Sequence, residues 1–100
     1  MELYNPLADS TFPAKTVAYT ATAGSTGTWN AGPQGVMVWS STACYVSVGE
    51  GVTATTSSTP IPANTLVPLI VPQGTGAPWR VSALQVSTGG DIYCKPINIR

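Results

Sequence analysis

Hydrophobic and polar residues along this chain follow the pattern of short β-strands. Apolar and polar residues alternate at Cys44–Val48, where Cys44, Val46 and Val48 share one face, as in a half-buried strand. No window of a dozen residues free of Gly and Pro has apolar residues at the helical spacing i, i+3, i+4, i+7. Strands are predicted at Thr16–Thr22, Val36–Ser40, Ala43–Val48, Leu66–Val71, Trp79–Val86 and Ile92–Ile99.

The strands and the turns between them predict an all-β fold, a single small antiparallel β-sandwich that is jelly-roll-like or barrel-like. Gly32–Gly35 and Thr88–Asp91 have turn composition, and the Ser/Thr-rich stretch Thr53–Pro60 is expected to be a surface loop. Proline cannot donate to a ladder. Pro68 is therefore expected at a sheet edge or a bulge, and Pro96 at an edge.

Residues 1–15 precede this domain as an extended segment, so the expected division is an N-terminal arm at 1–15 and a β-sandwich domain at 16–100. Pro6 and Pro13 interrupt the segment, and its apolar residues follow neither a helical nor a strand period. Two interpretations stay open, a frayed terminus or an arm that anchors on a neighbouring subunit. The candidate arm contacts are Leu3, Tyr4, Leu7 and Phe12.

The composition lacks charge. Charged residues make up 8% of the chain, with four basic and four acidic residues and a net charge of zero, against about 25% in a typical soluble domain. We expect no nucleic-acid partner, because no excess of Lys and Arg is available to neutralise phosphates. No membrane contact is expected, since no apolar run approaches the ~18 residues of a spanning helix. The start shows no basic and then apolar secretory signal.

The residues that usually carry catalysis are scarce. The chain contains no histidine, so a Ser-His-Asp or Cys-His site cannot be built within it. Glu50 and Asp91 flank glycine turns and are interpreted as solvated loop residues rather than a catalytic pair. Cys44 and Cys94 are too few for a zinc site. They are interpreted as small buried apolar side chains, with a disulfide as the alternative. No catalytic, cofactor-binding or metal-binding residue is predicted, and no cofactor.

The aromatic residues suggest two different roles. Trp39 and Trp79 lie in apolar strands, which favours a place in the core or in a subunit contact. Trp29 is next to Asn30 in a polar loop and is the candidate exposed aromatic. A sugar-stacking platform formed by tryptophan and tyrosine side chains is the alternative, and a glycan would then be the partner.

From about Val36 to Ile99, a series of short pieces occurs in the same order as in a known group of proteins. The pieces are Ser41–Gly49 (STACYVSVG), Thr53–Thr55 (TAT), Ile61–Ala63 (IPA), Val71–Gly74 (VPQG), Val81–Ser87 (VSALQVS) and Gly89–Tyr93 (GGDIY). With these pieces the chain resembles small tailed-bacteriophage virion accessory proteins, which are capsid decoration (cement-like) or minor structural proteins. The resemblance implies a β-sandwich and no catalytic residues to carry over.

The resemblance leads us to expect a non-enzymatic virion structural protein. The leading hypothesis is a capsid decoration (cement) protein that stabilises the phage head from its surface after assembly in the host cytoplasm. Its expected partners are the major capsid protein and copies of itself, as a trimer. The alternatives are a collar, tail or fibre attachment protein, or a small carbohydrate-binding module that uses Trp29 and neighbouring tyrosines. The low charge agrees with a surface packed against other subunits.

Overall fold

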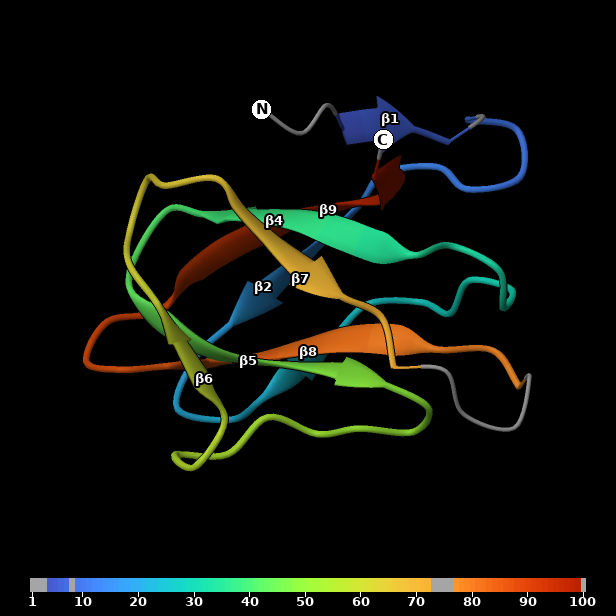
Figure 1. Cartoon of the computed structure of the whole chain (residues 1–100). Coiled ribbons are helices and arrows are strands. Elements are labelled where there is room, and N and C mark those ends of the chain that lie inside the picture. The colour runs from blue at the N-terminus through green and yellow to red at the C-terminus, as the bar shows by residue number, and fades with distance from the viewer. Residues whose placement is uncertain (1–3, 8, 73–76, 100) are drawn as a thin grey trace.

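The computed structural model describes residues 4–7, 9–72 and 77–99. These residues form β-strands and contain no helix, so the predicted all-β class is confirmed (Figure 1). The strands are β1 (Tyr4–Pro6), β2 (Lys15–Tyr19), β3 (Gly24–Ser25), β4 (Gly35–Ser40), β5 (Cys44–Gly49), β6 (Thr59–Ile61), β7 (Val67–Ile70), β8 (Arg80–Gln85) and β9 (Gly90–Ile99).

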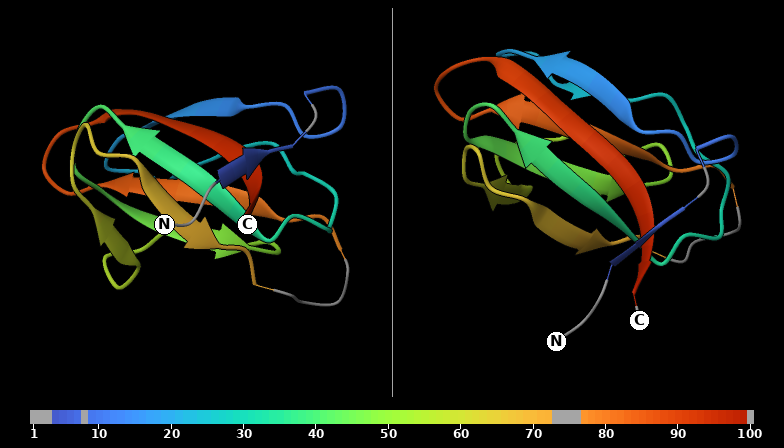
Figure 2. Two further views of the ribbon diagram at one scale, coloured as in Figure 1. Left: turned by 45° about the horizontal axis from the view of Figure 1, so that its top comes forward. Right: turned by 90° about the horizontal axis from the view of Figure 1, so that it is seen from above.

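The strands form two antiparallel sheets. The first has the order β1-β9-β4-β7, with β2 also paired to β9. The second has the order β3-β8-β5-β6. Figure 2 shows the two sheets as separate layers, with the long β9 running the length of the first layer. Strands far apart in sequence, such as β2 and β9 or β3 and β8, are therefore neighbours in space.

The core lies between the two sheets and follows the period of two that the sequence shows. One face of each central strand is buried against the other sheet, because successive side chains of a strand point to opposite faces. The core also contains the aromatic side chains of Tyr19, Trp29 and Trp79. The central strands supply Val36 and Val38 from β4, Cys44 and Val46 from β5, Val81 and Ala83 from β8, and Ile92 and Cys94 from β9.

Three short strands lie outside the predicted ones: β1, in the segment expected to be an arm, and two strands in polar stretches. β3 lies in a Gly/Ser/Thr stretch, and β6 includes Thr59 and Pro60, which the sequence assigned to a surface loop. β3 pairs with β8 and β6 with β5. Segments this short and polar become strands because an adjacent strand offers unpaired backbone groups, and no periodicity within the segment reveals that.

The two proline predictions had different outcomes. Pro68 is in β7, the last strand of the first sheet, so its predicted edge position is confirmed. Pro96 is in β9, which has β4 on one side and β1 and β2 on the other, so its predicted edge position is wrong. The missing Pro96 donor points toward the gap between β1 and β2, because the Pro96 carbonyl accepts from Leu7 N–H at 3.2 Å on that side.

The prediction that Trp29 is exposed is also wrong, because its side chain is only 2% exposed. Its ring packs against Trp79 with centroids 4.8 Å apart, and the two residues exchange backbone hydrogen bonds of 2.9 and 3.0 Å. The indole Nε1–H donates to the Pro13 carbonyl at 2.8 Å. A polar loop thus carries one large apolar side chain into the core, and its partner is fifty residues away in the sequence.

Candidate functional site

The outer surface of the first sheet carries large side chains that remain in contact with solvent. Trp39 on β4 is 37% exposed and Tyr93 on β9 is 43% exposed. They are directly paired across the two strands, and their rings lie 5.2 Å apart at an angle of 43°. Leu66 and Ile70, at the two ends of the adjacent β7, are also exposed.

The register explains why these side chains share a face. Met37 and Trp39 alternate with the buried Val36 and Val38 of β4, so they point away from the core. The pairing of β4 with β7 opposes Gly35 to Ile70, which places Ile70 on the same side as Met37. We call the surface formed by Met37, Trp39, Leu66, Ile70 and Tyr93 the apolar face.

The apolar face includes a shallow hollow of about 160 Å³. Met37, Trp39, Leu66 and Tyr93 line it together with Ala14, Cys94 and Lys95. Lys95 is the cation among these lining residues, and its Nζ is paired with the Asp9 carboxylate and donates to the Phe12 carbonyl at 2.9 Å. The hollow therefore presents mainly aromatic and aliphatic surface to a partner.

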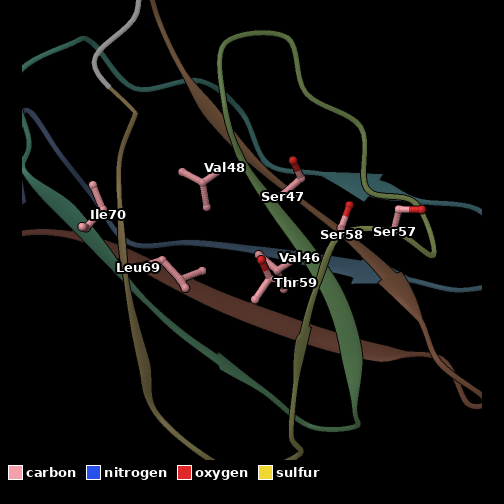
Figure 3. A pocket seen from close by; sticks show the side chains of 8 residues that line it. All are labelled: Val46, Ser47, Val48, Ser57, Ser58, Thr59, Leu69 and Ile70. Atoms are coloured by element: carbon pink, nitrogen blue, oxygen red, sulfur yellow. The ribbon is translucent and has the colours of Figure 1, made fainter.

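A second concavity, of about 290 Å³, lies between the edge strands of the two sheets (Figure 3). β6 pairs with β5 only as far as Val46, so the groove opens beside the continuation of β5. Its lining residues carry no charge. Hydroxyl groups and aliphatic side chains line it, from Val46, Ser47, Val48, Ser57, Ser58, Thr59, Leu69 and Ile70.

The structure places the predicted arm residues against their own chain. Tyr4 is in β1 and pairs with Ile99 of β9. Leu7 is half-buried, and Phe12 is half-buried and packs against the core. Leu3 lies outside the described residues. Contact of these side chains with a neighbouring subunit stays a prediction.

The carboxylates that the sequence considered as a pair are not brought together. Glu50 follows the C-terminal end of β5. The backbone N–H of Asp91 is hydrogen-bonded to Ser41 Oγ at 3.0 Å, and Ser41 precedes the start of β5. The length of β5 therefore separates the two, about 20 Å at ~3.3 Å per residue. A glycosidase pair needs about 5–9.5 Å.

Both cysteines are buried and carry free thiols, so the prediction that they are buried is confirmed. Burial raises the pKa of the Cys94 thiol to about 12, and the nearby Cys44 adds to the rise. Burial also raises the pKa of Cys44. At neutral pH both thiols are protonated and face the core, so they are poor nucleophiles. Across residues 4–7, 9–72 and 77–99, no three His, Cys, Asp or Glu residues gather in a metal-binding group.

Sequence reasoning identified Trp39 as a core or contact residue but did not identify its pairing with Tyr93. The signal in the sequence is the short apolar run Val36–Ser40, in which both strand faces are apolar. That run does not show which face the other sheet covers. The pairing of Trp39 with Tyr93 depends on the register of β4 against β9.

Comparisons of the chain with protein-family models, with curated proteins and with solved structures find no match. The described part of the chain has no helix long and apolar enough to cross a membrane.

Proposed function

We propose that this chain is a non-enzymatic phage virion structural protein, a capsid decoration protein. In this proposal it binds the major capsid protein lattice on the head surface through the apolar face, beside copies of itself in a trimer. The observation that carries the proposal is the exposed Trp39–Tyr93 pair on that face. Aromatic side chains are enriched in the buried centres of protein interfaces, where a few of them contribute most of the binding energy.

The strand connectivity supports a jelly-roll form of the β-sandwich as part of this proposal. The antiparallel pairs β2–β9, β3–β8, β4–β7 and β5–β6 are nested, as if one long hairpin had been folded over into two sheets. Eight strands divided between two sheets in this manner are typical of jelly rolls, which occur in viral capsid and lectin domains.

The proposed docking surface has little charge to desolvate. Lys95 at the rim of the hollow is already paired with Asp9. Burying an unpaired charge is costly, whereas burying aromatic and aliphatic surface is favourable. A partner with a complementary apolar surface would therefore bind this face without leaving a buried charge unpaired.

The role in the virion is tested by comparing particles assembled with and without the chain. We expect particles that lack it to release their genome at a lower temperature, because the interface area between capsid subunits is smaller. An unchanged release temperature would contradict the stabilising role. Copy number separates head from neck or tail positions, since a decoration protein is present in hundreds of copies and a symmetric collar or tail ring in about a dozen or fewer.

The docking surface is tested with the double variant Trp39→Ser/Tyr93→Ser. We expect its binding to particles that lack the chain to weaken by roughly 30-fold or more, as for loss of central aromatic residues in an interface. Val86→Ser is the control, because Val86 is also an exposed large apolar residue but lies outside the apolar face. Equal binding by the double variant and the wild type would refute docking through this face.

The exposed aromatic pair also favours one second candidate, a carbohydrate-binding module. Trp29, which the sequence suggests for sugar stacking, is buried, so stacking on a sugar would use Trp39 and Tyr93 instead. Titration with a panel of glycans, followed by tryptophan fluorescence, tests this candidate. A change in fluorescence that disappears in Trp39→Phe/Tyr93→Ser would support it, and a flat response across the panel would exclude it.

A further inference from the structure

β1 and β2 lie along the same edge of β9, but their registers differ by six residues. Paired residue numbers sum to 103 for β1, as in Pro6 with Ile97, and to 109 for β2, as in Lys15 with Cys94. Two residues of β9 separate these pairs, whereas eight residues of chain separate Pro6 from Lys15. Residues 8–13 are therefore an insertion into what would otherwise be one continuous edge strand.

The attachment of β1 to β9 lacks one hydrogen bond at the insertion. In an antiparallel ladder a hydrogen-bonded pair exchanges two N–H···O bonds. Leu7 N–H donates to the Pro96 carbonyl at 3.2 Å, but Pro96 has no N–H to donate in return. β1 is three residues long, and among the described strands it pairs with β9 alone. Figure 2 shows it at the periphery, beside the C-terminal end of β9.

Among the described residues of the inserted segment, Phe12 and Pro13, which lie next to β2, contact the core. Trp29 Nε1–H donates to the Pro13 carbonyl at 2.8 Å, and Phe12 packs against the core. Nearer β1, the Asp9 side chain is paired with Lys95 and is 93% exposed, whereas the Lys95 side chain is 15% exposed. Water therefore screens the pair at Asp9, and Lys95 Nζ also donates to the Phe12 carbonyl. The five residues between Pro6 and Phe12 could span about 16 Å when extended, at ~3.3 Å per residue.

We propose that β1 exchanges between copies of this chain and pairs with the β9 edge of a second copy. The exchanged strand would keep the register of Tyr4 with Ile99 and of Pro6 with Ile97, so it would form the same ladder bonds in trans. When β1 leaves its own chain it loses its ladder bonds to β9, the Leu7–Pro96 hydrogen bond and the Asp9–Lys95 pair. The same register on a second copy offers equivalent partners for all three. Exchange of an identical element between protomers is a low-cost route to association. It concerns the chain in solution and does not depend on the proposed role in a virion.

The test mixes two single variants of the full chain, Tyr4→Cys and Ile99→Cys, under oxidation by glutathione disulfide. Tyr4 and Ile99 form a non-hydrogen-bonded pair, whose Cα separation of about 4.5 Å permits a disulfide. Each variant carries only one of the two introduced cysteines, beside the buried Cys44 and Cys94. A 4–99 bond therefore joins two chains and forms only when β1 of one chain lies on β9 of another. Tyr4→Cys mixed with Ser87→Cys is the control, because Ser87 is exposed and far from β1 in the register.

Non-reducing electrophoresis with mass spectrometry measures the product. We expect an interchain 4–99 disulfide well above the control, with a dimer-to-monomer ratio that rises roughly tenfold for each tenfold rise in protein concentration while dimers are rare. The proposal is overturned if the mixture gives no more cross-link than the control. In that case the double variant Tyr4→Cys/Ile99→Cys should form only an intrachain disulfide at every concentration.

A shortened chain gives an independent check. Deleting residues 8–13 would join β1 and β2 in one register, with Leu7 opposite Pro96 and Ala14 opposite Lys95. β1 could then leave β9 only if the whole edge strand separated. We expect interchain 4–99 cross-linking to fall at least about tenfold in this background, because the slack is gone. Undiminished cross-linking in a folded shortened chain would refute exchange through the insertion. The mixed-variant test stands whether or not the shortened chain folds.

Discussion

Replacing Trp29 by alanine removes a side chain that the core contains although its sequence context is polar. The indole is 2% exposed, packs against Trp79 with ring centroids 4.8 Å apart and donates its N–H to the Pro13 carbonyl. The same substitution at Trp39, which is 37% exposed, is the matched control. The two variants lose the same atoms, one from the core and the other from the surface.

The expected cost follows from these contacts. Truncating a buried Trp to Ala lowers the free energy of unfolding by about 3–5 kcal/mol. Within that cost, the aromatic pair accounts for about 0.5–1.5 kcal/mol and the net hydrogen bond for about 1 kcal/mol. Trp39→Ala should cost about 1 kcal/mol, because less apolar surface is taken from a buried environment. The difference between the variants should therefore be about 2–4 kcal/mol.

Urea unfolding followed by far-UV circular dichroism measures both costs. With a denaturant slope of about 2 kcal/mol/M, Trp29→Ala should lower the midpoint by about 2 M and Trp39→Ala by about 0.5 M. Trp29→Phe keeps a ring against Trp79 but loses the donor to Pro13, so its midpoint should fall between those of the wild type and Trp29→Ala. Equal midpoints for the two alanine variants would refute the assignment of Trp29 to the core and of Trp39 to the surface.

Two further predictions concern pH and a close backbone contact. The pKa of Cys94 is raised to about 12, so the unfolded chain loses this proton first. The contribution of this thiol to the free energy of unfolding should then be fully present below about pH 8.5. It should fall between that pH and pH 12, by up to about 1.4 kcal/mol per pH unit. A urea series in Cys94→Ala should show a shallower fall, and an equal slope would contradict the assignment. Gly24→Ala would put its Cβ 2.2 Å from the backbone oxygen of Ala18, so we expect a loss of about 1–3 kcal/mol. Gly27→Ala, which meets only the flexible end of Lys15, should cost much less by the same urea assay.

The sequence predicts the strands that carry the candidate site. The apolar run Val36–Ser40 and the β-rich run before Ile99 indicate strands, and the position of Trp39 in its strand favours the core or a subunit contact. The pattern does not show which side of β4 faces solvent, because Met37 and Trp39 on one side are as apolar as Val36 and Val38 on the other. Only the position of the second sheet decides which set is covered.

Proline shows the same limit within the sheet itself. The absence of an N–H at Pro68 and Pro96 follows from the residue type, and each must face a place where no bond is needed. At Pro68 that place is the open edge of β7. At Pro96 it is the gap that residues 8–13 leave between β1 and β2. The sequence alone predicts that such a place exists, but an interior strand with an interrupted neighbour serves as well as an edge.

The sequence by itself determined the all-β class, the burial of both cysteines and the positions of the longer strands. These depend on the local period of two and on residue type, which every strand carries within its own few residues. Only the tertiary structure decided that Trp29 is buried against Trp79 while Trp39 meets solvent beside Tyr93. The physical reason is that burial depends on which distant strand lies opposite a side chain, and that is set by pairing across the whole chain.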